Sequence, residues 1–162
     1  MFAYCGNNPS NCIDETGMWT LAISVRADFT FFFLGMSISI GISFDGNGNV
    51  VIQSSYSAPN YVNNDETYNV GLMDAGAGFS FQVTDDDTVF DLEGPSSYAG
   101  AAGGNGGYIA VDMVYSGVKM MDDASSEALP NGIQVTVGGG VGIDAHFRST
   151  QTKTILIIRS AE

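Results

Sequence analysis

The fold is decided by the stretch SISIGISFDGNGNVVIQSSYS, residues 37–57. Ile38, Ile40 and Ile42 alternate with serine and glycine, which is the period of two residues expected of a β-strand with two different faces. The next residues, 45–49, have the sequence Asp-Gly-Asn-Gly-Asn, which favours a tight turn, and residues 50–57 return to strand composition. The stretch therefore predicts a β-hairpin with one bulky apolar face and one face of small polar residues.

The same alternation recurs in residues 75–84 and 133–148, and residues 108–115 and 152–159 are predicted to be further strands. A straight strand over residues 133–148 would span about 50 Å, so we expect a bend at the glycines of 138–140. Residues 94–107 are predicted to be a glycine-rich loop, and 122–129 a short helix that Pro130 ends. The predicted fold is all-β, an antiparallel barrel or sandwich of about seven to nine strands with at most one short helix.

Composition excludes several classes of protein. The 162 residues suffice for one domain, and 44% hydrophobic residues with 18 aromatic ones exclude an acidic disordered tail. The formal net charge of −13 disfavours nucleic-acid binding, because such a surface repels a phosphate backbone. The glycine run of residues 100–107 lacks the lysine and the following helix of a phosphate-binding loop, so no cofactor is predicted.

The two faces of the predicted strands allow two interpretations. In a soluble β-domain the apolar face is the core and the polar face meets water, whereas in a membrane barrel they face the lipid and the lumen. Residues 29–33 are mostly apolar rather than alternating, with Thr30 as the one polar residue among them, and aromatic girdles are not evident. We therefore expect a soluble β-domain, with the membrane barrel as the alternative.

Candidate chemistry centres on the only histidine, His146, which shares one strand face with Asp144 and Arg148. A carboxylate beside a histidine can orient a general base, so this triplet is the candidate catalytic site. The simpler interpretation is an exposed polar stripe, and we expect that the chain is not an enzyme. Asp85, Asp86 and Asp87 are candidate Ca²⁺ ligands, although a solvated turn explains them better. A single histidine without a Cys-x-x-Cys pair argues against zinc.

Residues 1–17, MFAYCGNNPSNCIDETG, resemble the end of the core domain of the Rhs/YD-repeat family, which a variable C-terminal module follows. Pro9, Asp14 and Gly17 match the spacing of the family motif, and Met18 stands where leucine is usual. The family has proline where this chain has Glu15. The resemblance implies an Rhs-type terminal segment at 1–17 and a glycine-rich antiparallel β-domain at 18–162. It also implies a self-cleavage role for Asp14.

The resemblance implies the C-terminal tip module of an Rhs-type protein, and because no catalytic constellation is evident in the sequence we expect the module to be non-catalytic and to act by binding or assembly. The alternative is a polymorphic toxin tip, either membrane-permeabilising or an enzyme that uses Asp144 and His146. The expected partners are the parent Rhs cage and a protein or a second copy bound through strand edges. No secretory signal peptide is evident, so secretion or surface display would depend on a larger parent. Whether Cys5 and Cys12 form a disulfide stays open.

Overall fold

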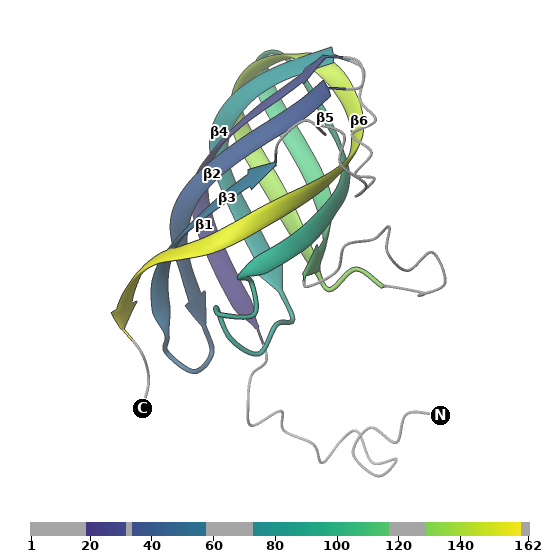
Figure 1. Ribbon diagram of the computed structural model, residues 1–162. Coiled ribbons are helices and arrows are strands. Elements are labelled where there is room, and N and C mark those ends of the chain that lie inside the picture. The colour runs from purple at the N-terminus through teal and green to yellow at the C-terminus, as the bar shows by residue number, and fades with distance from the viewer. Residues whose placement is uncertain (1–18, 32–33, 58–72, 117–128, 160–162) are drawn as a thin grey trace, which may run out of the picture.

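All regular elements of the computed structural model are β-strands, and the structure describes residues 19–31, 34–57, 73–116 and 129–159 (Figure 1). These residues contain no helix, and so none with the length and apolar character needed to cross a membrane. The strands are β1 (Thr20–Phe31), β2 (Leu34–Asp45), β3 (Val50–Ser57), β4 (Met73–Thr84), β5 (Gly94–Ser116) and β6 (Gly132–Arg159).

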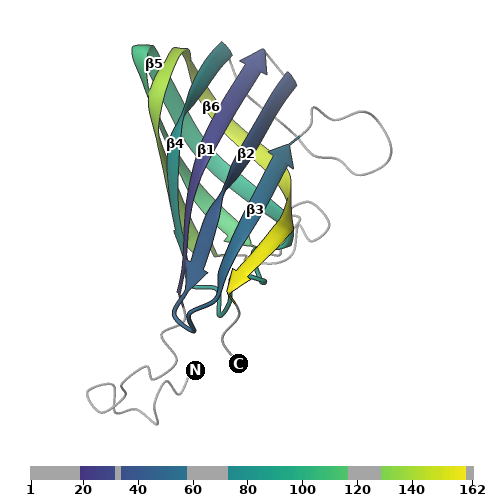
Figure 2. The same ribbon diagram turned by 90° about the vertical axis from the view of Figure 1, so that its left-hand side faces the viewer.

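The strands form one antiparallel sheet that closes into a ring. Their order is β3-β2-β1-β4-β6-β5, and a further β3–β6 pairing joins the ends. Strand β6 takes part in the ring with both of its parts, because its first part pairs with β4 and its last part with β3, while β5 pairs with β6 along most of its length. The predicted antiparallel all-β fold is thereby confirmed, and Figure 2 shows the tilted strands of the barrel wall side by side.

The long strands β5 and β6 pair along 21 residues and bend together. Gly100 lies so close to Asp112 that a Cβ on Gly100 would be 2.9 Å from the Asp112 Cα. A straight strand would separate these residues by about 40 Å, so β5 reverses between them. Gly106 and Gly142 have φ values of 97° and 116°, which glycine adopts without the steric cost of a side chain. These two glycines permit the reversal in β5 and in β6.

Two local predictions need correction, and a third falls almost wholly outside the described residues. The glycine-rich segment 94–107 is strand, not loop, because glycines let neighbouring backbones approach closely where side chains would collide. The glycine with positive φ in β6 is Gly142, two residues beyond the predicted bend at 138–140. The predicted helix 122–129 lies outside the described residues except for its last residue.

The apolar side chains of the strands point outward and the polar ones inward. Residues Val25, Ile40 and Phe79 are cross-strand neighbours at the middle of β1, β2 and β4, and they are 54%, 55% and 63% exposed. Other exposed apolar side chains on the wall are Ile23, Phe29, Met36, Ile38, Phe81, Ile109, Val111, Met113, Ile133, Val137, Val141, Ile143 and Ile155 to Ile158. The apolar surface thus extends over β1, β2, β4, β5 and β6, and β3 adds to it the half-exposed side chain of Tyr56.

The expectation that the apolar face forms the core is therefore wrong. The buried side chains are mainly serine, threonine, glutamine, aspartate and arginine, and the buried apolar cluster consists of Ala102, Tyr108 and Ala110. A narrow barrel encloses little volume, and small polar side chains fill it while bonding to one another. The sequence pattern divides each strand correctly into an apolar and a polar face. In the structure, however, the apolar face lies on the outside of the barrel and the polar face on the inside.

Residues 85–93 close one end of the barrel. Val89 and Leu92 of this segment are buried, and the Val89 backbone N–H donates to Asp45 Oδ2 at 3.0 Å. The Gln53 side-chain amide donates to the Val89 carbonyl at 2.8 Å. The segment is therefore held by inward-facing side chains, Asp45 at the end of β2 and Gln53 in the middle of β3.

Close approach inside the barrel makes Gly76 a sensitive position. A Cβ at Gly76 would lie 2.7 Å from the ring of Tyr108, which is buried and fixed by its hydroxyl bond to Asp74 Oδ2 at 2.9 Å. We expect Gly76→Val to lower the free energy of unfolding by about 1–3 kcal/mol, as overpacking does. Equilibrium urea unfolding measures this change. Ala77→Val, on the exposed face of the same strand, is the control, and an equal loss there would contradict the explanation.

Candidate functional site

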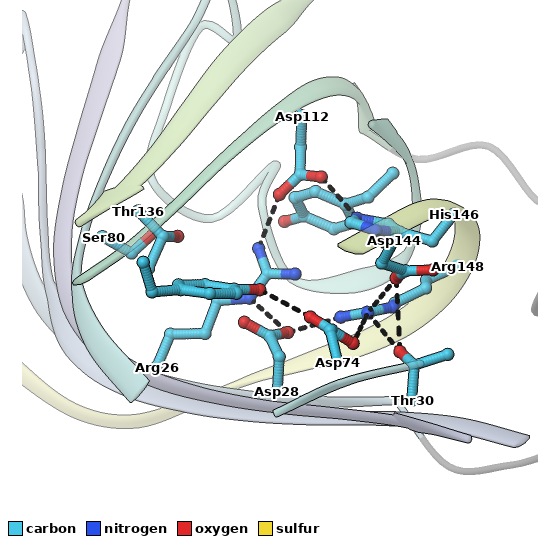
Figure 3. A network of polar contacts seen from close by, with 12 residues as sticks. Arg26, Asp28, Thr30, Asp74, Ser80, Asp112, Thr136, Asp144, His146 and Arg148 are labelled. Atoms are coloured by element: carbon cyan, nitrogen blue, oxygen red, sulfur yellow. Dashed lines mark hydrogen bonds and ion pairs between the residues drawn. The ribbon is translucent and has the colours of Figure 1, made fainter. Parts of the chain in front are cut away.

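A network of charged side chains crosses the lumen of the barrel (Figure 3). Its cationic members are Arg26 on β1 and His146 and Arg148 on β6, and its carboxylates come from β1, β4, β5 and β6. The carboxylates are Asp28, Asp74, Asp112 and Asp144. All of these side chains are buried and point from their strands into the lumen of the barrel.

Two arginines connect different strands through this network. Arg26 donates from Nε to Asp28 Oδ1 and from Nη1 to Asp112 Oδ2, both at 2.9 Å. Arg148 donates from Nη1 to Asp28 Oδ1 and from Nη2 to Asp144 Oδ2, the latter at 2.9 Å. Asp28 therefore accepts from both guanidinium groups and links β1 to β6.

His146 lies between two carboxylates. Its Nδ1 is 2.8 Å from Asp144 Oδ2 and its Nε2 is 2.6 Å from Asp112 Oδ1. Both contacts are N–H donations only for the imidazolium ion, which has two N–H groups. With that form the network contains four negative and three positive groups, and thus has a net charge of −1 (−4 + 3). The network is therefore acidic in balance.

Within the part of the chain that the structure describes, three buried polar atoms of the network find no hydrogen-bond partner. They are Asp28 Oδ2, Asp74 Oδ1 and Arg148 Nε. Asp74 Oδ1 is also 3.7 Å from Arg148 Nη2, a distance that permits attraction without a hydrogen bond. Buried polar groups without protein partners are commonly satisfied by ordered water. We therefore expect water between these three atoms.

The structure brings the predicted triplet together, but not as an exposed stripe. Asp144, His146 and Arg148 are 1%, 5% and 0% exposed, and both ring nitrogens of His146 are engaged by carboxylates. A general base needs a free nitrogen within reach of a substrate proton. In this structure the three residues are therefore part of the charged network in the lumen.

The other candidate residues lie elsewhere or outside the described residues. Asp86 follows β4 and accepts from Ser116 Oγ and Asn131 Nδ2, each at 2.9 Å, while Asp85 and Asp87 are exposed. Partial burial raises the pKa of Asp86 above its usual value. Within the described part of the chain, no group of three or more His, Cys, Asp or Glu residues is arranged to hold a metal ion. Asp14, Cys5 and Cys12 lie outside it.

Sequence reasoning missed four members of the network. They are Arg26 and Asp28 on β1, Asp74 on β4 and Asp112 on β5, which lie far in the chain from Asp144, His146 and Arg148 and stand among small inward-facing residues. The available signal was the position of the charges, all of them in the inward phase of their strands. That signal has meaning only once the polar face is known to be the inside.

Comparison of the chain with protein-family models, curated proteins and solved structures finds no match.

Proposed function

We propose that this domain is a β-barrel whose outer wall lies among the acyl chains of a lipid bilayer. The observation that carries the proposal is the inversion of the barrel, with an apolar outside and a charged, hydrogen-bonded inside. Apolar patches on soluble monomers rarely exceed a few hundred Å². Here apolar side chains occupy nearly every outward position of β1, β2 and β4.

The length of the strands supports a bilayer as the partner. Strands β1, β2 and β4 each have 12 residues, which extend about 40 Å along the strand. At the tilt of about 45° usual in membrane barrels, this length covers about 28 Å of depth, close to the hydrocarbon thickness of about 30 Å. Trp19 and Phe31 are exposed aromatic residues at the two ends of β1. Their positions suit the two membrane interfaces.

Two features favour lipid over a protein partner. A docking site for one protein is a patch on one side, whereas this apolar surface continues from β2 through β1, β4 and β6 to β5. The strand edges expected to recruit a second copy pair with each other in β3 and β6. Assembly through strand edges and attachment to an Rhs cage stay predictions. If the domain is attached to an Rhs cage, it would be the membrane-binding tip of a secreted or surface-displayed parent protein.

The enzyme alternative has less support. His146 contacts carboxylates through both nitrogens, and its side chain is 1% exposed. An enzyme at this position would have to open the network to admit a substrate. The proposed role of the network is to satisfy the polar interior of a membrane-embedded barrel, since unpaired polar groups are costly away from water.

Vesicle flotation tests the proposal. The full chain, refolded from urea with phosphatidylcholine vesicles, is expected to float with them and to resist extraction by 1 M NaCl and by alkaline carbonate. A folded chain that stays in the soluble fraction as a monomer would overturn the proposal. Stable soluble oligomers would indicate that copies of the chain cover the apolar wall instead.

Lipid charge provides a further prediction. The chain has a formal net charge of −13, and two of its five Lys and Arg residues, Arg26 and Arg148, are inside the lumen. Insertion is therefore expected to be slower with phosphatidylglycerol vesicles than with phosphatidylcholine vesicles at low salt. The difference should shrink in 1 M NaCl, where the screening length is about 3 Å. Faster insertion into the anionic vesicles would contradict this electrostatic argument.

A further inference from the structure

We propose that residues 153–159, the last part of β6, bind an extended peptide that adds a strand to the sheet. We call this segment the open edge. The peptide that fits it is apolar in its middle and acidic at its two ends. This binding activity goes beyond the proposed membrane position and does not depend on it, because it uses the end of one strand rather than the whole apolar wall.

Strand β6 continues beyond the point where its pairing with β5 ends. The last pair between the two strands is Gly94 with Thr152, whereas β6 runs on to Arg159. On one side, the open edge pairs with residues 50–54 of β3, and Figure 2 shows this end of β6 beside β3. On the other side, within the described residues, no strand and no loop backbone is bonded to it. Ring closure therefore uses one side of this segment and leaves the other side open.

The open edge is also exposed on both of its faces. Ile155, Leu156, Ile157 and Ile158 are consecutive, and each is between 52% and 57% exposed. Consecutive residues of a strand point to opposite faces, so the segment does not follow the inside-outside alternation of the barrel wall. A strand added beside it would cover apolar side chains on both faces through cross-strand contacts.

The backbone of the open edge can bind such a strand. Successive residues of a strand direct their N–H and C=O groups alternately to the two sides, so about half of these groups in residues 153–159 face away from β3. An unpaired strand edge is a template for another extended chain, because main-chain hydrogen bonds supply affinity whatever the partner's sequence. The side chains of the edge then decide which sequence binds.

The charges of the open edge select an acidic partner. Of the basic residues that the structure describes, Arg26 and Arg148 are buried in the lumen, whereas Lys153 and Arg159 are exposed at the two ends of the open edge. The chain has a net charge of −13, so these two side chains form a local basic pair on an acidic protein. Carboxylates at the two ends of a bound peptide would complement them.

The same charges disfavour a second copy of the chain as the occupant. Antiparallel pairing of two open edges about Leu156 would place Lys153 of one copy opposite Arg159 of the other. Like charges directly opposite each other destabilise a pair of strands. A peptide with glutamate at both ends replaces this repulsion by attraction, and it is therefore the better occupant.

Peptide binding to the folded full chain tests the inference, with fluorescence anisotropy as the measurement. The probe is fluorescein-labelled Glu-Thr-Val-Ile-Val-Thr-Glu, and the matched control has lysine at both ends. The acidic peptide is expected to bind at least about tenfold more tightly, since the control places like charges together. Non-specific attraction to a chain of net charge −13 would favour the lysine peptide instead. The double variant Lys153→Glu, Arg159→Glu should reverse the preference.

A third peptide tests the hydrogen bonds. N-methylation of alternate residues of the acidic peptide removes the N–H groups of one side, and the form methylated on the side that pairs should lose binding. Equal binding of the acidic and lysine peptides, or undiminished binding of both methylated forms, would overturn the inference. Failure of every peptide to bind would overturn it too, and dimers of the chain in the same preparation would then assign the edge to a second copy. Vesicle flotation tests the membrane position separately.

Discussion

Phe79→Arg is expected to weaken the membrane-inserted barrel by about 2–4 kcal/mol, the cost of a lipid-facing arginine near the bilayer midplane. Phe79 lies at the middle of β4, is 63% exposed, and pairs with Val25 on one side and Val137 on the other. Those neighbours are exposed and apolar too, so the guanidinium would find no polar partner along this row. The expected loss corresponds to a factor of roughly 30 to 800 in the folding equilibrium.

The measurement is reversible urea unfolding in phosphatidylcholine vesicles, followed by the fluorescence of Trp19, the only tryptophan. Asp87→Arg places the same charge in the exposed turn after β4 and should change stability little. If the wall faced water, Phe79→Arg would instead leave stability nearly unchanged and raise solubility. Such a result would count against the bilayer.

Asp112→Ala is expected to destabilise the barrel by about 3–5 kcal/mol, because it leaves buried charged groups without a partner. Asp112 is 0% exposed and accepts from Arg26 Nη1 at 2.9 Å and contacts His146 Nε2 at 2.6 Å. Removing the carboxylate would leave Arg26 Nη1 and His146 Nε2 without this acceptor in the lumen. Asp112→Asn retains one acceptor oxygen and should lose less.

Urea unfolding under the same conditions measures both variants, with the exposed Asp87→Ala as the matched loss of one carboxylate. A loss for Asp112→Ala no larger than that for Asp87→Ala would mean that water fills the site and solvates Arg26 and His146. The lumen would then be wetter than its packing indicates. The order expected from the structure is Asp112→Ala, then Asp112→Asn, then Asp87→Ala.

Much of the wall was predictable from local pattern. The hairpin over 37–57 forms as expected, with the turn at 45–49 and Gly48 in a positive φ conformation. The division of residues 133–148 into an apolar and a polar face also matches the exposed Ile133 and Val137 and the buried Gln134 and Thr136. The turn and the two faces can be predicted because they depend on local sequence alone. In any β-strand, residues two positions apart lie on the same face.

The glycine-rich segment 94–107 shows where local pattern misleads. Glycine is frequent in loops, yet here Gly100 and Gly104 allow one half of β5 to pass against the other half. The reason is a contact between residues that are distant in the chain, such as Gly100 and Asp112. A propensity that averages over many proteins carries no information about such a contact.

The sequence by itself determined most of the strands, their alternating faces, the β2–β3 hairpin with its short turn and the excess of acidic over basic residues. Only the tertiary structure decided which face is inside, because alternation is identical for a core facing inward and a wall facing lipid. Closure of β3 on β6 turned the polar face into a lumen. That closure brought Arg26, Asp28, Asp112 and Arg148 into contact across as many as 120 positions of the chain. Charges so far apart in sequence meet only when the ring is complete.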